Sequence, residues 1–168
     1  MRIAASRLHS CVLIFCVAFV GCSNQGPNIA ATFNQGASLV GTLPANPLQW
    51  KVITSMLNTK DSTMATLYGN DMAVQYSRTH SQHDYPAGST LALVTWSQAD
   101  DARWFGAKIP NQVKSVEFVF VRVIASDGTT YTYQKYEGSP LRMLFVQEGF
   151  GPNERAGYLL AQRAAVMP

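Results

Sequence analysis

The residues of this chain that could do metal chemistry lie in one short stretch. His80 and His83 are three positions apart, and Asp84 follows directly. Two imidazoles at this spacing can bind one metal ion if a helix carries both, and the carboxylate can complete a facial triad. The competing interpretation is a helix C-terminus, because stretch 81–86 is polar and contains a proline, and histidine suits the negative end of the helix dipole. No third ligand stands out elsewhere, so the pattern favours the helix end.

Two charged residues interrupt an otherwise apolar strand predicted over Val116 to Ile124. Glu117 and Arg122 are five positions apart, so their side chains face opposite sides of the sheet and cannot pair with each other. We expect each to meet a partner from another element or to lie at a solvated edge. A buried guanidinium is costly unless it binds something. Arg122 is therefore a candidate ligand-binding residue.

The sequence contains no motif for other kinds of catalytic or binding chemistry. There is no Ser-His-Asp signature, phosphate-binding loop or paired-carboxylate motif in a recognisable context. The aromatic residues could line a pocket for a planar ligand, but the more common role of such residues is core packing. These absences assign no enzymatic activity.

The first 21 residues have the pattern of a bacterial lipoprotein export signal. Arg2 and Arg7 precede an apolar run, CVLIFCVAFV at 11–20, which is too short to span a bilayer. Residues 19–22 (FVGC) fit a lipobox, in which the Cys22 thiol is the nucleophile that accepts the diacylglyceryl group. The alternative is an ordinary cleaved signal. Ser23 favours the outer membrane, so we expect a lipoprotein anchored on the periplasmic side of the envelope.

Processing leaves a mature chain that is almost neutral and without free thiols. Two of the 13 basic residues leave with the signal, and 10 acidic residues remain, so no basic stripe exists to bind nucleic acid. Of the three cysteines, Cys11 and Cys16 are discarded and Cys22 is acylated. Residues 22–45 carry no charge and are rich in Asn, Gln, Gly, Ser and Ala, which predicts a tether, and the folded domain is expected over 46–168.

The remaining pattern predicts an antiparallel sheet with a few packed helices, an α+β fold. Helices are expected over 70–79 and 153–162, and strands over 52–57, 64–68, 90–96, 116–124 and 129–136. The last two strands flank Asp127-Gly128, a pair typical of a tight hairpin turn. Trp104 and Phe105, in a loop-like stretch, are expected to cover an edge of the core. Tyr158 and Leu159 are expected to be buried positions of the last helix.

The stretch from Trp50 to Leu141 resembles the cytochrome P-460 family. These are small periplasmic c-type haem proteins, related to the c-prime-beta cytochromes, that share an antiparallel-sheet fold and often form dimers. The resemblance is carried by TLYGNDMAVQYSRTH (66–80), YPAGSTLALVTWSQ (85–98), RWFGAKIP (103–110) and SVEFV (115–119). It implies the fold, a pocket, a homodimer, and hydroxylamine oxidation or binding of gases such as nitric oxide at a haem.

The sequence departs from that family where the haem is attached. Family members carry Cys-x-x-Cys-His near the C-terminus, whereas residues 144–158 read LFVQEGFGPNERAGY, without cysteine or histidine. Nor does a lysine match the family's porphyrin cross-link, since Lys108 lies in the loop after strand 90–96. We therefore expect no covalent haem and a domain that binds a small ligand or a protein. The alternatives are a haem held non-covalently by His80 or His83, with redox or nitric oxide chemistry, and a purely structural envelope lipoprotein.

Overall fold

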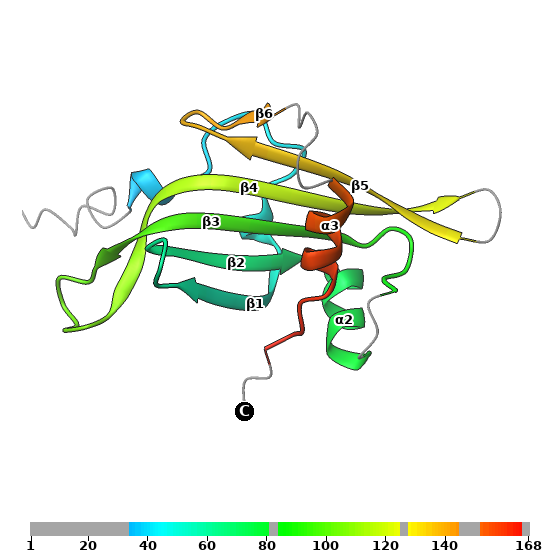
Figure 1. Cartoon of the computed structure of the whole chain (residues 1–168), viewed down its shortest axis with the longest axis horizontal. Coiled ribbons are helices and arrows are strands. Elements are labelled where there is room, and N and C mark those ends of the chain that lie inside the picture. Colours follow the sequence, from blue (N-terminus) through cyan, green and yellow to red (C-terminus); the bar gives the residue numbers. More distant parts are fainter. Residues whose placement is uncertain (1–33, 81–83, 125–127, 145–151, 166–168) are drawn as a thin grey trace, which may run out of the picture. The chain divides into compact units, whose positions relative to one another are not determined.

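The computed structural model describes residues 34–80, 84–124, 128–144 and 152–165. Six antiparallel strands form one sheet in which each strand pairs with its neighbours in the chain, in the order β1 to β6 (Figure 1). Such a meander needs only short connections between successive strands. The strands are β1 (Lys51–Asn58), β2 (Thr63–Gly69), β3 (Thr90–Asp100), β4 (Lys108–Ile124), β5 (Gly128–Glu137) and β6 (Arg142–Leu144). With two α-helices packed on it, this sheet confirms the α+β fold.

Strands β3 and β4 form the interior of the sheet. Residues 91–94 of β3 and 115–119 of β4 are buried on both faces, as expected for apolar runs of strand length. Both strands continue beyond the predicted bounds, and the ladder pairs Asp100 with Lys108. The polar composition of this part suggested a loop. Strand pairing depends on backbone hydrogen bonds, so the ladder continues through polar residues, with irregular register around Trp96.

Helix α2 (Asp71–Thr79) begins where the sequence predicts it. The Asn70 side chain accepts a hydrogen bond from the Ala73 amide at 3.0 Å, which satisfies one of the free donors of the first turn. The amide group of Asn70 also donates to the Gly88 carbonyl at 2.8 Å. One side chain therefore starts the helix and fixes it to the loop that leads into β3.

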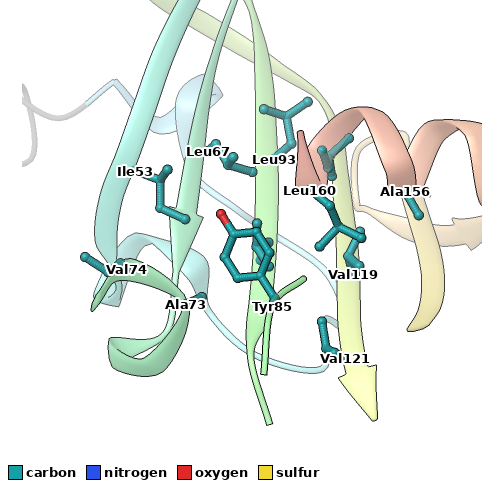
Figure 2. Close-up of a cluster of buried hydrophobic side chains, with 12 residues drawn as sticks. Ile53, Leu67, Ala73, Val74, Tyr85, Leu93, Val119, Val121, Ala156 and Leu160 are labelled. Carbon is teal, nitrogen blue, oxygen red and sulfur yellow. The ribbon is translucent and has the colours of Figure 1, made fainter. Parts of the chain in front are cut away.

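One face of the sheet packs against α2 and α3 (Pro152–Leu160). Its core combines strand residues with Ala73 and Val74 of α2 and with Ala156 and Leu160 of α3, and Tyr85 from the preceding loop inserts its ring among them (Figure 2). In α3 the buried positions are 156, 159 and 160. Tyr158, which was expected to be buried, is 44% exposed, because the helix turns positions 156, 159 and 160 to the sheet.

The opposite face has a second core, covered by residues 37–50 and by Leu141. Short 3₁₀ turns at Gln35–Ala37 (η1) and Pro47–Gln49 (η2) shape this segment. The Trp96 indole donates to the Ala37 carbonyl at 2.9 Å, and the Leu141 amide donates to the Val40 carbonyl at 2.7 Å. Residues 34–45, which the composition assigns to a tether, thus contact the sheet.

Phe118 lies at the centre of this second core and is fully buried. Its ring stacks on Phe120 with centroids 5.7 Å apart and meets Trp50 and Tyr136 edge-on. Phe118 and Phe120 share this face because residues two positions apart on a strand point to the same side. None of the helices in the described part of the chain has the length and hydropathy that a bilayer span requires.

Candidate functional site

A buried carboxylate and a guanidinium meet between the sheet and α3. Glu117 of β4 is only 2% exposed, and Arg155 of α3 binds both of its oxygens, from Nε to Oε2 at 2.7 Å and from Nη2 to Oε1 at 2.8 Å. The Tyr133 hydroxyl of β5 donates to Oε2 at 2.6 Å. This two-point geometry gives the strongest kind of carboxylate–guanidinium contact. The expectation that Glu117 meets a partner from another element is confirmed.

Strand alternation and helix packing place these groups together. Glu117 faces the helices for the same reason as Val119, two residues further along β4. The antiparallel register sets Tyr133 opposite Val119, so its side chain emerges on the same face. Burial of Leu159 and its helical neighbours against the sheet then fixes α3, which brings Arg155 over the carboxylate.

At neutral pH, Glu117 and Arg155 are charged and the Tyr133 phenol is protonated. Burial opposes ionisation of Glu117, but the hydrogen bonds from Arg155 and Tyr133 outweigh burial and lower the pKa of its carboxyl group. Burial and the neighbouring carboxylate both raise the pKa of Tyr133, so its phenol stays protonated. The hydrogen bond to Glu117 raises the pKa of Arg155. Because none of these shifts brings a proton exchange near pH 7, the group is suited to positioning rather than to acid–base catalysis.

Beside this ion pair lies a cavity of about 540 Å³. It lies between α3 and the part of the sheet next to the β1–β2 turn. This volume falls within the range of small-molecule sites. Its lining includes Met56, Ala65, Leu93, Thr95, Arg155 and Tyr158.

The cavity walls combine apolar side chains with polar groups, some of which already have hydrogen-bond partners. The Tyr158 hydroxyl donates to the Met56 sulfur at 3.5 Å, and the Arg155 guanidinium lies 4.8 Å from the centre of the Tyr158 ring. At the rim, the Asn58 amide donates to Asp61 at 2.8 Å. The charge of Arg155 is balanced by Glu117, while Asp61 and three threonines add further polar atoms to the walls, so the site can contact a small molecule through both apolar and polar groups.

His80 lies away from this cavity, at the end of α2. Its ring stacks on Tyr76 with centroids 4.2 Å apart, and its Nδ1 shares a hydrogen bond with the Thr79 hydroxyl at 2.8 Å. Tyr76, Thr79 and His80 line a shallow pocket of about 190 Å³, together with Met72. Met72 and Tyr76 share one face of α2, and His80, which follows the helix with an extended backbone, lies beside them at the same pocket.

The other candidate residues either lie away from the cavity or fall outside the described residues. His83 falls outside the described residues, and Asp84 is exposed. Within the described ranges, no three His, Cys, Asp or Glu side chains gather closely enough to bind a metal ion. Arg122 is exposed on β4, opposite Thr130, and lines neither pocket. Cys22 also falls outside the described residues.

Sequence reasoning identified Glu117 but not the residues around it. An acidic residue inside an apolar strand requires a cation nearby, which was a usable signal. Nothing in the sequence singles out Arg155 among the 13 basic residues, because only packing of α3 brings it to the sheet. Met56 and Tyr158 carry no signal of their own, since a strand methionine and a helix tyrosine are ordinary core residues.

Comparison with known proteins agrees with the meander described above. No curated protein matches the chain. The Cytochrome P460 family profile matches residues 44–141, which include β1 to β5 and α2 and make up more than half of the sequence. The match ends before α3, the helix that supplies Arg155 and Tyr158 to the cavity. The sheet and the matched residues together place this chain in the cytochrome P460 family.

Proposed function

We propose that this protein is a lipid-anchored member of the cytochrome P460 family that has lost covalent haem and binds a small, uncharged ligand in the cavity under α3. The observation that carries the proposal is the cavity of about 540 Å³ beside the Glu117–Arg155 ion pair. A buried charged pair is a poor source of stability for its own sake. Here it fixes Arg155 and Tyr158 in the cavity wall.

The residues present do not fit the c-type haem that the family implies. Thioether attachment needs cysteine thiols, and the three cysteines of the sequence are at positions 11, 16 and 22, with no Cys-x-x-Cys-His anywhere. The described lining of the large cavity holds neither histidine nor cysteine. Its Met56 sulfur and Tyr158 hydroxyl are hydrogen-bonded to each other. These observations support loss of the covalent cofactor, so no step of the proposed function involves haem.

The lipid anchor is supported by the sequence of the first 22 residues. A basic start, an apolar run too short to span a bilayer and the FVGC ending at Cys22 are the three parts of a lipoprotein signal. The export route places the domain on the periplasmic side of the envelope, and Ser23 favours the outer membrane.

The cavity is tested by filling it. Ala65 lies in β2 and lines the cavity, so Ala65→Phe occupies part of the volume. Thr132→Phe adds a ring of comparable size on the exposed side of β5 and is the matched control. Native mass spectrometry of the full protein released from detergent measures 1:1 adducts with N-phenyl-1-naphthylamine, an uncharged probe with an apolar body.

We expect the wild type and Thr132→Phe to form the adduct and Ala65→Phe to lose at least about tenfold in affinity, which is about 1.4 kcal/mol. Equal adducts in all three proteins, or no adduct in any, would remove the cavity as a binding site. Urea unfolding of each variant shows whether the fold is retained.

The haem alternative is tested on the same preparation. The purified protein should show no stoichiometric Soret band in its visible spectrum after expression in a haem-replete host. A stoichiometric band that disappears in His80→Ala or His83→Ala would replace the proposal by a non-covalent haem protein.

The anchor is tested in cells. Cys22→Ala removes the only thiol that could take the lipid, so the variant should leave the membrane fraction or accumulate as an unprocessed precursor. Identical processing and solubility of the variant and the wild type would rule out the lipoprotein.

A further inference from the structure

The tip of the β3–β4 hairpin, residues 101–107, exposes two aromatic side chains. The sequence predicts that Trp104 and Phe105 cover an edge of the core, but Trp104 is 71% exposed and Phe105 is fully exposed. Figure 1 shows this hairpin extending beyond the neighbouring β1–β2 turn. The prediction is wrong because the ladder continues to Asp100 and Lys108 and carries the aromatic pair away from the core. Adjacent exposed aromatic residues at a protruding tip indicate a surface that contacts another protein or a membrane.

The tip has a defined shape. The Ala107 amide donates to the Trp104 carbonyl at 3.0 Å, and Gly106 has a φ of 79°, the conformation that a type II turn requires at its third position. The Asp101 amide donates to the Ala107 carbonyl at 3.0 Å and closes the loop. Phe105 is therefore held at the outermost corner of the turn.

The N-terminal segment reaches the domain at this same hairpin. The Asn34 side chain donates to the carbonyls of Pro110 and Asn111 at 2.7 and 3.0 Å. Pro110 is five residues from Phe105, a span of at most about 18 Å, and the Asn34 amide lies 2.7 Å from its carbonyl, so Asn34 contacts the same hairpin as the tip. The twelve residues from Cys22 to Phe33 reach at most about 42 Å when fully extended. A lipid on Cys22 would thus hold a bilayer within reach of the tip.

The charges at the tip are balanced. Lys108 pairs with Asp100, and the Asp101 carboxylate accepts a hydrogen bond from the backbone amide of Arg103. With equal numbers of acidic and basic side chains, the tip does not select an anionic surface. The feature that remains is a tryptophan next to a phenylalanine, and tryptophan favours the boundary between lipid head groups and acyl chains.

We propose that Trp104 and Phe105 insert into the interface of the bilayer that holds the Cys22 lipid, so that the hairpin is a second membrane contact and orients the domain. This inference rests on the lipid anchor of the proposed function. It is independent of what the cavity binds.

The test uses the full lipidated protein reconstituted in phosphatidylcholine vesicles with brominated acyl chains, which quench nearby tryptophan. Trp104 is the reporter, since Trp96 is buried and Trp50 is half-buried. Brominated lipid should lower the fluorescence relative to unbrominated vesicles, and the quenched component should be absent from Trp104→Phe. Trp50→Phe should keep it. Because the tip is charge-balanced, high salt should leave the quenching unchanged.

Phe105→Ser tests insertion itself, since it removes an inserted side chain but keeps the reporter. We expect it to reduce the quenching of Trp104 at least twofold. The matched control is Val123→Ser, which removes an exposed apolar side chain on β4, away from the tip, and should leave the quenching intact.

Flotation of the same vesicles distinguishes a missing lipid anchor from a missing membrane contact at the tip. Protein that floats with the vesicles but shows no quenching has its anchor and no membrane contact at the tip, which overturns this inference alone. Protein that does not float lacks the anchor, which overturns the lipoprotein proposal and this inference with it. Equal quenching in Phe105→Ser and the wild type would also overturn the insertion of Phe105.

Discussion

Arg155→Met is expected to lower the free energy of unfolding by about 2–4 kcal/mol at neutral pH. The substitution leaves Glu117, 2% exposed, without its cation. Removing one partner of a buried ion pair costs about 3–5 kcal/mol. The Arg155 side chain is 40% exposed, so water reaches the vacated space, and Tyr133 still donates to the carboxylate. Both effects reduce the loss to the lower range.

The pH dependence of this loss follows from the direction of the pKa shift. The folded wild type lowers the pKa of Glu117 below its ordinary value of 4.5. The stabilisation from the pair is therefore complete above about pH 4.5 and lost as the pH falls through the folded pKa. Without Arg155, burial dominates and raises the pKa of Glu117, so the variant gains stability on acidification. The difference between the two proteins should be largest at neutral pH. It should begin to shrink as the pH falls through the raised pKa of Glu117 in the variant, and it should continue to shrink until the pH reaches the lowered pKa in the wild type.

Urea unfolding followed by circular dichroism at pH 7 and at pH 4 measures both effects. The triple variant Glu117→Leu, Tyr133→Phe and Arg155→Met removes the whole polar group, and apolar replacement of a buried pair is often neutral. It should recover most of the stability lost by Arg155→Met. Lys51→Met, which breaks the exposed Lys51–Asp71 pair, is the surface control and should leave the midpoint unchanged.

Two results would refute the reasoning. A loss below about 1 kcal/mol at pH 7 would match an exposed ion pair rather than a buried one. A loss of the same size at pH 4 and pH 7 would mean that it comes from packing of the arginine stem and not from the charge of Glu117.

Three further substitutions test the packing, each by urea unfolding. Phe118→Ala should cost about 3–5 kcal/mol because its ring is fully buried, and the half-buried Phe120→Ala should cost less; equal losses would contradict the second core. Gly69→Ala should cost about 1–3 kcal/mol, since its Cβ would lie 2.8 Å from Ile53 Cδ1, and an unchanged midpoint would exclude this close approach. Asn70→Ala should cost about 1–2 kcal/mol through loss of the α2 cap, and Asn70→Ser should recover part of it.

The sequence determined most elements of the fold because their signals are local, whereas it missed β6 and the outer parts of β3 and β4. Asn70 before an amphipathic stretch predicts the start of α2, and apolar runs predict the buried strands β3 and β4. Strand alternation predicts that Phe118 and Phe120 share a face and that Glu117 and Arg122 do not. The family resemblance seen in the residues between Trp50 and Leu141 is confirmed by the matched range 44–141.

Only the tertiary structure decided which distant residues meet. Arg155 reaches Glu117 across 38 positions of sequence, and Tyr158 reaches the Met56 sulfur across 102, because α3 packs on the sheet. Composition could not predict that Trp104 and Phe105 lie in solvent, since an aromatic pair looks the same in sequence whether it faces a core or not. Periodicity records which side of an element is apolar, whereas the partner of that side is set by packing of the whole chain.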